Sequence, residues 1–146
     1  MRYNRHMTDA DKKDLKYIRF KQRFENFDKA YAQFQVILKK NPKDDIVVRT
    51  ALIQTFEFTF ELAWKVMQDL LEVKNGIEAS SPRLVLQEAY QQKYFADVKP
   101  WAKAMKKRNE SSHAYAEAIA VDVEHFIRSV YASLLESFYA FAKENL

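Results

Sequence analysis

The chain of 146 residues contains no cysteine, a single glycine and only three prolines. The absence of cysteine excludes disulfide bonds, thiolate metal sites and a cysteine nucleophile, and it is typical of a protein in a reducing compartment. Strands joined by tight turns need glycine and proline, so the scarcity of both argues against a β-rich fold. The composition therefore predicts an all-α protein, and we expect a cytoplasmic location.

Long apolar runs are also missing. No run approaches the roughly 20 residues of a membrane span, and the start, MRYNRHMTDADKKD, lacks the apolar segment of a signal peptide, so we expect no membrane association. The formal charge of +4 and the pI near 9.2 are mildly basic, which permits a polyanionic partner without requiring one. The expected organisation is a basic tail at residues 1–10 and one helical domain at 11–146, and whether residues 1–7 are native is left open.

Metal and cofactor sites find little support in the sequence. His6, His113 and His125 have no metal-ligand spacing, and the acidic residues are spread over several helix faces. Gly76, the single glycine, cannot form a glycine-rich phosphate loop. We therefore expect neither a metal nor a cofactor.

Apolar residues recur every three or four positions over several long segments, which is the periodicity of an amphipathic helix. Pro42 breaks the first segment, Gly76 ends the second, and Ser81 followed by Pro82 is typical of the start of a third. We expect an up-and-down bundle of about five helices. The expected helices are residues 11–40, 45–75, 81–93, a short one from about Trp101 to Arg108, and 112–144.

The second of these helices is apolar on two sides. Its main face contains Ile53, Phe56, Phe60, Ala63, Trp64, Met67, Leu70 and Leu71, and a second face contains Phe58, Leu62, Val66 and Val73. A helix with two apolar faces is either central in its bundle or shared with another subunit. The pattern therefore gives a reason to expect a homodimer.

Two charged residues occupy positions where apolar residues belong. Arg108 follows Trp101 by seven residues and lies on the buried stripe of the fourth helix, where a guanidinium needs an anionic partner. Glu57 lies on the main apolar face of the second helix and is the candidate partner, whereas Glu61 is expected to face solvent. A purely structural ion pair between Glu57 and Arg108 is an equally good interpretation.

The segment KKRNESSHAY, residues 106–115, places Arg108 and His113 five positions apart, which would leave them on different faces of a continuous helix. Serine and asparagine cap helices, so we expect the chain to turn between Asn109 and Ser112, with Arg108 ending one helix and His113 beginning the next. A helix N-terminus favours a neutral imidazole, which can accept a proton. If the turn brings Arg108 and His113 together, both side chains could act on one phosphodiester. A capped corner without a catalytic role is the alternative.

Lysines surround this segment. Lys99, Lys103, Lys106 and Lys107 take helical angles that can face water, so they are candidates for contacts with the phosphates of RNA or a nucleotide. A solvated helix face is at least as good an interpretation of these lysines.

RNESSHAY, residues 108–115, resembles the Arg-polar-x3-His-x-Tyr motif of HEPN domains, in particular the nucleotidyltransferase substrate-binding proteins. Three longer stretches are similar to the same group and occur in the same order: FEFTFELAWKVMQDLLE at 56–72, GIEASSPRLVLQEAY at 76–90 and WAKAMKKRNESSHAY at 101–115. The resemblance covers the chain from the second helix onward, and the first helix matches only in character.

This resemblance implies a homodimeric helical bundle that acts with a small nucleotidyltransferase encoded nearby. In related HEPN toxins, an Arg and a His form a metal-independent ribonuclease site at the dimer interface, and the partner enzyme transfers AMP to the motif tyrosine. By this resemblance Arg108 would stabilise the scissile phosphate, His113 would be the general base or acid, Asn109 would orient the site, and Tyr115 would be modified.

Two hypotheses of function follow from the resemblance. The first is a toxin ribonuclease that cuts RNA by attack of a 2′-hydroxyl on the adjacent phosphate. The second is a non-catalytic subunit that binds a substrate or nucleotide and presents it to the nucleotidyltransferase. The identity of the substrate and of the partner does not follow from the sequence.

Overall fold

The computed structural model describes residues 6–40 and 45–146, and this part of the chain is helical with no strand. Pro42 and residues 1–5 of the basic tail lie outside the described residues. The elements in chain order are α1 (Asp9–Lys39), α2 (Ile46–Leu70), the π-helical turn η2 (Leu71–Asn75), α3 (Pro82–Gln91), α4 (Val98–Glu110), the 3-10 turn η3 (Ser111–His113), α5 (Glu117–Phe126), the π-helical turn η4 (Ile127–Tyr131) and α6 (Ala132–Glu144). The prediction of an all-α bundle of about five helices is confirmed, with α5, η4 and α6 forming the last long helix.

Helix α1 begins with a capping box. The Thr8 side chain accepts a hydrogen bond from the Asp11 backbone amide at 3.1 Å, and the Asp11 carboxylate accepts one from the Thr8 amide at 3.0 Å. Two of the amide donors that a helix start leaves unpaired are thereby satisfied. The spacing of three and four residues predicts an apolar seam along this helix at Tyr17, Phe20, Phe24, Phe27, Tyr31, Phe34 and Leu38. The four phenylalanines are buried, and the other three residues are partly buried against the core.

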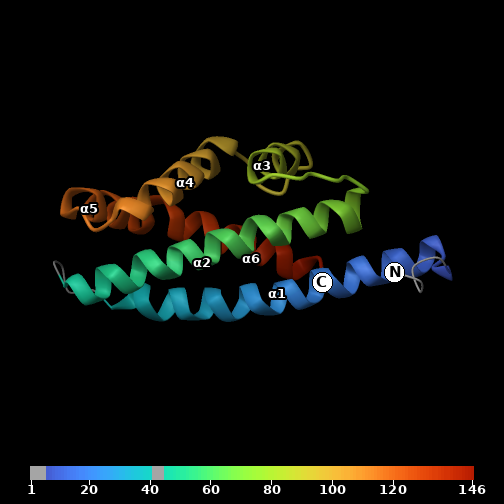
Figure 1. Ribbon diagram of the computed structural model, residues 1–146, viewed down its shortest axis with the longest axis horizontal. Helices are drawn as coiled ribbons and strands as arrows, with labels where there is room; N and C mark the ends of the chain where they lie inside the picture. The colour runs from blue at the N-terminus through green and yellow to red at the C-terminus, as the bar shows by residue number, and fades with distance from the viewer. Residues whose placement is uncertain (1–5, 41–44) are drawn as a thin grey trace.

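Helix α2 is central in the bundle. It contacts α1, α3, α4, α5 and α6, and Figure 1 shows it between the long α1 and the layer formed by α3 and α4. Asp45 caps its start by accepting hydrogen bonds from the amides of Val47 and Val48 at 2.9 and 3.3 Å. Gly76 follows η2 with φ of +66°, a left-handed conformation that glycine adopts without steric strain. Both ends therefore agree with the prediction.

The second apolar face predicted for this helix is mostly covered within the chain. Val66 is fully buried, and Leu62 and Val73 pack against the core. Phe58 is 52% exposed. Of the two interpretations, a central position in the bundle is therefore the one that the structure shows, and the homodimer stays a prediction.

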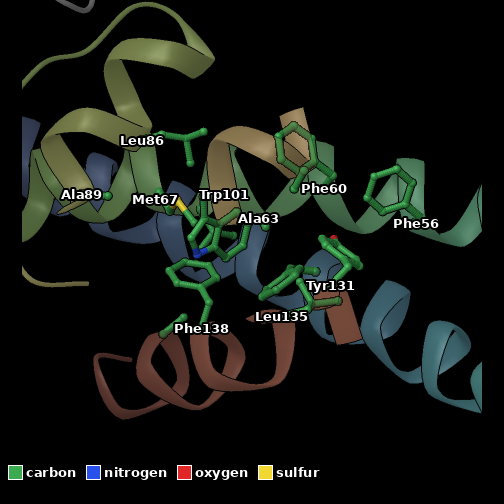
Figure 2. Packing of buried hydrophobic residues seen from close by; sticks show 14 of the residues in the cluster. Phe56, Phe60, Ala63, Met67, Leu86, Ala89, Trp101, Tyr131, Leu135 and Phe138 are labelled. Carbon is green, nitrogen blue, oxygen red and sulfur yellow. The ribbon is translucent and has the colours of Figure 1, made fainter. Parts of the chain in front are cut away.

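The core is built from aliphatic and aromatic side chains of several helices (Figure 2), and we call an aromatic part of it the aromatic seam. It comprises Phe20, Phe24, Phe27 and Phe34 of α1, Phe56 and Phe60 of α2, Trp101 of α4, Tyr131 of η4 and Phe138 of α6. The buried Tyr131 hydroxyl shares a hydrogen bond of 2.8 Å with Thr59, which satisfies a polar atom that would otherwise be unpaired in the core. Trp101 packs edge-on against Phe138, with ring centroids 5.9 Å apart.

The helix boundaries beyond α2 agree with the prediction in part. Ser81 caps α3 and Pro82 is its first residue, as expected. The last helix begins at Glu117 and not at Ser112, because residues 111–113 continue the helical path of α4 as a 3-10 turn. Within the described ranges, no helix is sufficiently long and apolar to span a lipid bilayer.

Candidate functional site

Arg108 lies in the last turn of α4 and extends its side chain toward α2. Its Nη1 donates a hydrogen bond to Oε2 of Glu57 at 3.2 Å. The ion pair expected from the sequence is therefore present. The two side chains are 30% and 26% exposed, so the pair is only partly shielded from water.

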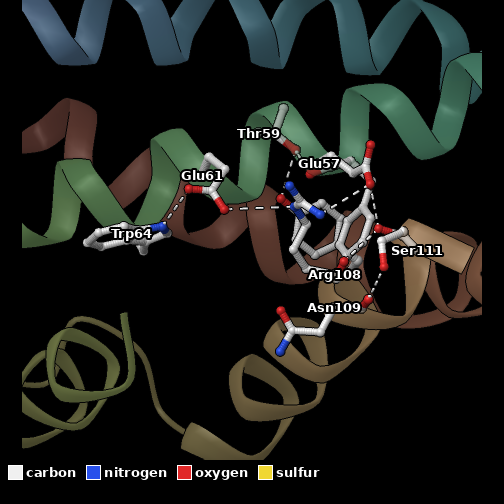
Figure 3. A network of polar contacts seen from close by, with 10 residues as sticks. Glu57, Thr59, Glu61, Trp64, Arg108, Asn109 and Ser111 are labelled. Carbon is white, nitrogen blue, oxygen red and sulfur yellow. Dashed lines mark hydrogen bonds and ion pairs between the residues drawn. The ribbon is translucent and has the colours of Figure 1, made fainter. Parts of the chain in front are cut away.

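Glu61 lies one helical turn after Glu57 and takes part in the same contact (Figure 3). Its Oε1 is 3.8 Å from Nε of Arg108, and its Oε2 accepts a hydrogen bond from Nε1 of Trp64 at 3.1 Å. The Glu61 side chain is 43% exposed, so it is in contact with water as expected. Its contact with Arg108 was not expected, and it arises because the spacing from Glu57 places both carboxylates on one face of α2. We call Glu57, Glu61, Arg108 and Ser111 the polar junction.

Ser111 completes the polar junction from the C-terminal end of α4. Its buried hydroxyl is 2.5 Å from Oε2 of Glu57 and 2.6 Å from the Arg108 carbonyl oxygen, so its single proton is shared between two acceptors. One carboxylate oxygen of Glu57 thus holds both Arg108 and the turn that follows it. Nη2 of Arg108 has no hydrogen-bond or ion-pair partner among the described residues.

The corner after Arg108 differs from the prediction. Ser111 and Ser112 direct their hydroxyls back to the carbonyls of Arg108 and Asn109, at 2.6 and 2.9 Å, and do not cap a following helix. This back-bonding is the alternative that serine offers to capping. The chain consequently stays helical through His113 and turns at residues 114–116, so the predicted turn between Asn109 and Ser112 is wrong.

His113 is exposed and lies in η3, four residues before α5. The prediction that His113 begins the last helix is therefore wrong. No contact joins His113 to Arg108 within the described parts of the chain, because Arg108 is directed to α2. The ring of His113 instead lies edge-on to Tyr115, with centroids 6.1 Å apart and planes at 74°.

Tyr115 is 87% exposed. Asn109 is also exposed, and Figure 3 shows its amide directed away from the polar junction. Only the backbone carbonyl of Asn109 is engaged, as the acceptor for Ser112. The structure thus leaves the side chains of Asn109, His113 and Tyr115 accessible.

The lysines near the motif fall into two groups. Lys107 is half-buried, and its ammonium is paired with Asp122 at 2.5 Å and Glu110 at 3.2 Å. The hydrogen bond to Asp122 raises the pKa of Lys107, and the same bond lowers the pKa of Asp122. Lys107 therefore does not face water freely, contrary to expectation. Lys103, whose ammonium is 5.7 Å from the Phe126 ring centroid, and Lys106 are exposed.

A pocket of about 660 Å³ lies between the first half of α2 and the segment from the end of the motif into α5, Ala114 to Ala120. Ile46, Ile53, Ala114 and Ala120 form its apolar lining, Thr50 and Gln54 its neutral polar lining, and Arg49, Glu57 and Glu117 its charged lining, with Tyr115 at its edge. The sequence did not predict this pocket. The spacing of Ile46, Thr50, Ile53 and Glu57 by three or four residues was the available signal, because it defines one face of a helix.

Metal-ligand geometry is absent from the described part of the chain, in which no three His, Cys, Asp or Glu side chains gather closely enough to hold an ion. The site therefore offers a guanidinium, an imidazole, a phenol and a pocket.

A comparison with protein families gives a match over residues 22–144, to the family described as nucleotidyltransferase substrate binding protein like. The chain belongs to this family. Its matched region contains α2, the polar junction, the motif and the pocket, whereas the N-terminal part of α1, before residue 22, precedes the match. The resemblance to nucleotidyltransferase substrate-binding proteins is thereby confirmed.

A similar fold is found in a crystal structure of a protein from Thermus thermophilus. The two chains superpose with a TM-score of 0.74 and are 28% identical, and the alignment covers 80% of this chain and 98% of the other. A comparison with curated protein sequences gives no match.

Proposed function

We propose that this protein is the ribonuclease toxin of a two-component module and that a small nucleotidyltransferase neutralises it by transferring AMP to Tyr115. Membership of a family named for a nucleotidyltransferase supports the partnership. The observation that carries the proposal is the motif's arrangement. Glu57 and Ser111 hold Arg108 in one orientation with Nη2 unpaired among the described residues, while His113 and Tyr115 are exposed within the next seven residues.

In the proposed cleavage, a 2′-hydroxyl of RNA attacks the adjacent phosphorus. His113 accepts the hydroxyl proton, and Nη2 of Arg108 donates a hydrogen bond to a phosphoryl oxygen as negative charge develops there. The bond from phosphorus to the 5′-oxygen breaks, the 5′-oxygen takes up a proton, and the other product is a 2′,3′-cyclic phosphate. Asn109 would contact the substrate beside the scissile bond, and Lys103 and Lys106 would contact neighbouring phosphates.

Neutralisation uses the exposure of Tyr115. In the partner's active site, the phenol oxygen would attack the α-phosphorus of ATP, with loss of its proton and release of pyrophosphate. A side chain that is 87% exposed can enter another enzyme's active site without unfolding of the bundle. AMP on Tyr115 would place a negative charge and a bulky group next to His113.

The homodimer remains part of the proposal. A second copy would bring a second motif to the same cleft, and its His113 would supply the proton that the leaving 5′-oxygen needs.

One observation favours the alternative of a non-catalytic nucleotide-binding subunit. Arg108 is held between two carboxylates, and Lys107 is paired with Asp122. Both contacts reduce the positive potential that RNA would meet at the motif.

The test is cleavage of RNA by the purified protein without its partner, together with growth of cells that express it alone. We expect Arg108→Ala and His113→Ala to lower the cleavage rate by about 100-fold or more, as loss of a catalytic donor or base does. Arg83→Ala and His125→Ala are matched controls because both residues are exposed and lie outside the motif. A wild-type protein that neither cuts RNA nor slows growth would contradict the ribonuclease and leave the binding subunit.

A further inference from the structure

We propose that the pocket beside Tyr115 binds a nucleoside, with its base inside the pocket and its phosphate outside it, toward Arg108. The placement of the phosphate rests on the proposed function, whereas binding of the nucleoside rests on the pocket alone. Glu57 connects the two places, since it lines the pocket and also holds Arg108.

The size and walls of the pocket suit a flat, partly apolar ligand. A volume of about 660 Å³ is in the range of sites for small molecules. Ile53 and Ala120 provide apolar walls that are buried in the bundle. Tyr115 provides an aromatic ring at the edge of the pocket, and aromatic rings stack on bases of any sequence.

The charges of the lining argue against a phosphate inside the pocket. Glu57 and Glu117 contribute two carboxylates. The only cation among the described lining residues is Arg49, whose Nε donates a hydrogen bond to Glu124 at 2.9 Å, just as Glu57 is paired with Arg108. Carboxylates therefore outnumber guanidinium groups in the lining. An anion would therefore meet net negative charge, whereas the N–H and O–H donors of a nucleoside would meet acceptors.

Gln54 and Glu57 supply directional recognition. They lie three residues apart on the same face of α2, and both line the pocket. Oε2 of Glu57 is occupied by Arg108 and Ser111, while Oε1 has no hydrogen-bond partner among the residues that the structure describes. A carboxylate oxygen accepts from an exocyclic amino group, and a carboxamide can pair with adenine by one donor and one acceptor. Uracil, which lacks an amino group, would fit less well, so we assign the pocket to amino-bearing bases.

The experiment measures dissociation constants of the full chain for adenosine and for uridine by calorimetry. We expect adenosine to bind at least five times more tightly than uridine. Gln54→Leu keeps the bulk of the side chain but removes its amide, and it should weaken adenosine binding by roughly 5- to 15-fold, the value of one hydrogen bond. Gln33→Leu, at an exposed position of α1, is the matched control and should change neither constant.

A second arm tests the orientation. 5′-AMP should bind more tightly than adenosine, and Arg108→Ala should bring the ratio of the two dissociation constants close to one, whatever its effect on adenosine alone. Equal binding of adenosine and uridine, no binding of either, or no effect of Gln54→Leu would overturn the proposal. The ribonuclease is tested separately, because nucleosides report on the pocket without cleavage or AMP transfer. Cleavage without nucleoside binding would overturn only the pocket, and nucleoside binding without cleavage would overturn only the ribonuclease.

Discussion

The aromatic seam and the polar junction share helix α2 but differ in what holds them together. In the seam, Phe56 is fully buried and meets Tyr131 edge-on, with centroids 4.6 Å apart. One residue later in the chain, Glu57 faces the other way, to Arg108 and Ser111, and remains 26% exposed. The seam is dry and closely packed, whereas the junction is polar and open to water. Apolar burial is therefore concentrated in the seam, and charged groups that water can reach are concentrated in the junction.

The energetic scale of the two regions follows from this difference. Full burial of a phenylalanine side chain contributes about 1.5–3 kcal/mol relative to leaving it exposed. An ion pair that remains partly exposed to solvent contributes about 1 kcal/mol or less. A change in the seam should thus affect folding most, and a change in the junction should affect function with a small cost in stability.

Phe56→Ala should have the largest effect on stability. We expect a loss of about 3–5 kcal/mol in the free energy of unfolding, because the substitution leaves a cavity in the seam. Phe58→Ala is the matched control in the same helix, and it should cost less than about 1 kcal/mol since Phe58 is 52% exposed. Urea denaturation measures both. Equal losses at the two positions would contradict a dry seam confined to one chain and would indicate that an assembly covers Phe58.

Glu57→Gln should have a smaller effect on stability. The amide oxygen of glutamine can still accept hydrogen bonds from Arg108 and Ser111, so only the charge is lost, at a cost of about 0.5–1 kcal/mol. If Glu57 orients Arg108, the rate of RNA cleavage should fall by more than the small decrease in the folded fraction of the protein would explain. Glu25→Gln, at an exposed position of α1, is the control, and thermal unfolding and cleavage are the measurements. If Glu57→Gln lowered the free energy of unfolding as much as Phe56→Ala does, the conclusion that the seam contributes more to stability than the junction would be contradicted.

Asp69 is a third test, because it is a carboxylate near the seam. It is 3% exposed, accepts a hydrogen bond from Arg23 at 3.1 Å, and leaves Oδ2 unpaired within the described structure. Burial raises the pKa of Asp69 above its ordinary value of 3.8, against the opposing effects of Arg23 and Arg19. A folded-state pKa above the unfolded one means that the contribution to stability is present below pH 3.8 and is lost as pH rises through the folded value.

Asp69→Asn should remove this small dependence. The free energy of unfolding of the wild type minus that of the variant should fall as pH rises from below 3.8 to neutral, since other groups titrate equally in both proteins. Chemical denaturation at a series of pH values provides the measurement. A difference that grows with pH would show that Arg19 and Arg23 dominate over burial.

The sequence predicted the fold well because helix periodicity reports burial directly. The apolar positions of α1 from Tyr17 to Leu38 recur every three or four residues; the four phenylalanines among them are buried, and the remaining positions are partly buried. Capping residues such as Ser81 and the single glycine, Gly76, then located helix ends. These signals are local, so they do not depend on how distant segments meet.

The candidate site was predicted only in part, because its geometry depends on contacts between α2 and α4. The ion pair between Glu57 and Arg108 was predicted correctly, because each charged residue lies on an apolar face of its helix and needs a partner of opposite charge. The corner did not follow, since serine can cap a helix or bond back to it, and Ser111 does the latter while its proton is also shared with Glu57. The contact of Glu61 depends on which face of α2 meets α4, and the pocket depends on how residues 114–120 lie against α2. The sequence alone determines neither.

The π-helical turn η4 affects the position of the motif, although η4 follows the C-terminal end of α5 and the motif precedes its N-terminal end. A π-helical turn contains one residue more than an α-helical turn, and each residue of an α-helix turns the chain by about 100°. Deleting one residue from Ile127–Tyr131 would give an ordinary helix and rotate α5 about its axis relative to α6. Tyr115 and one wall of the pocket would swing with it. The orientation of Tyr115 relative to the rest of the bundle therefore depends on the number of residues in η4.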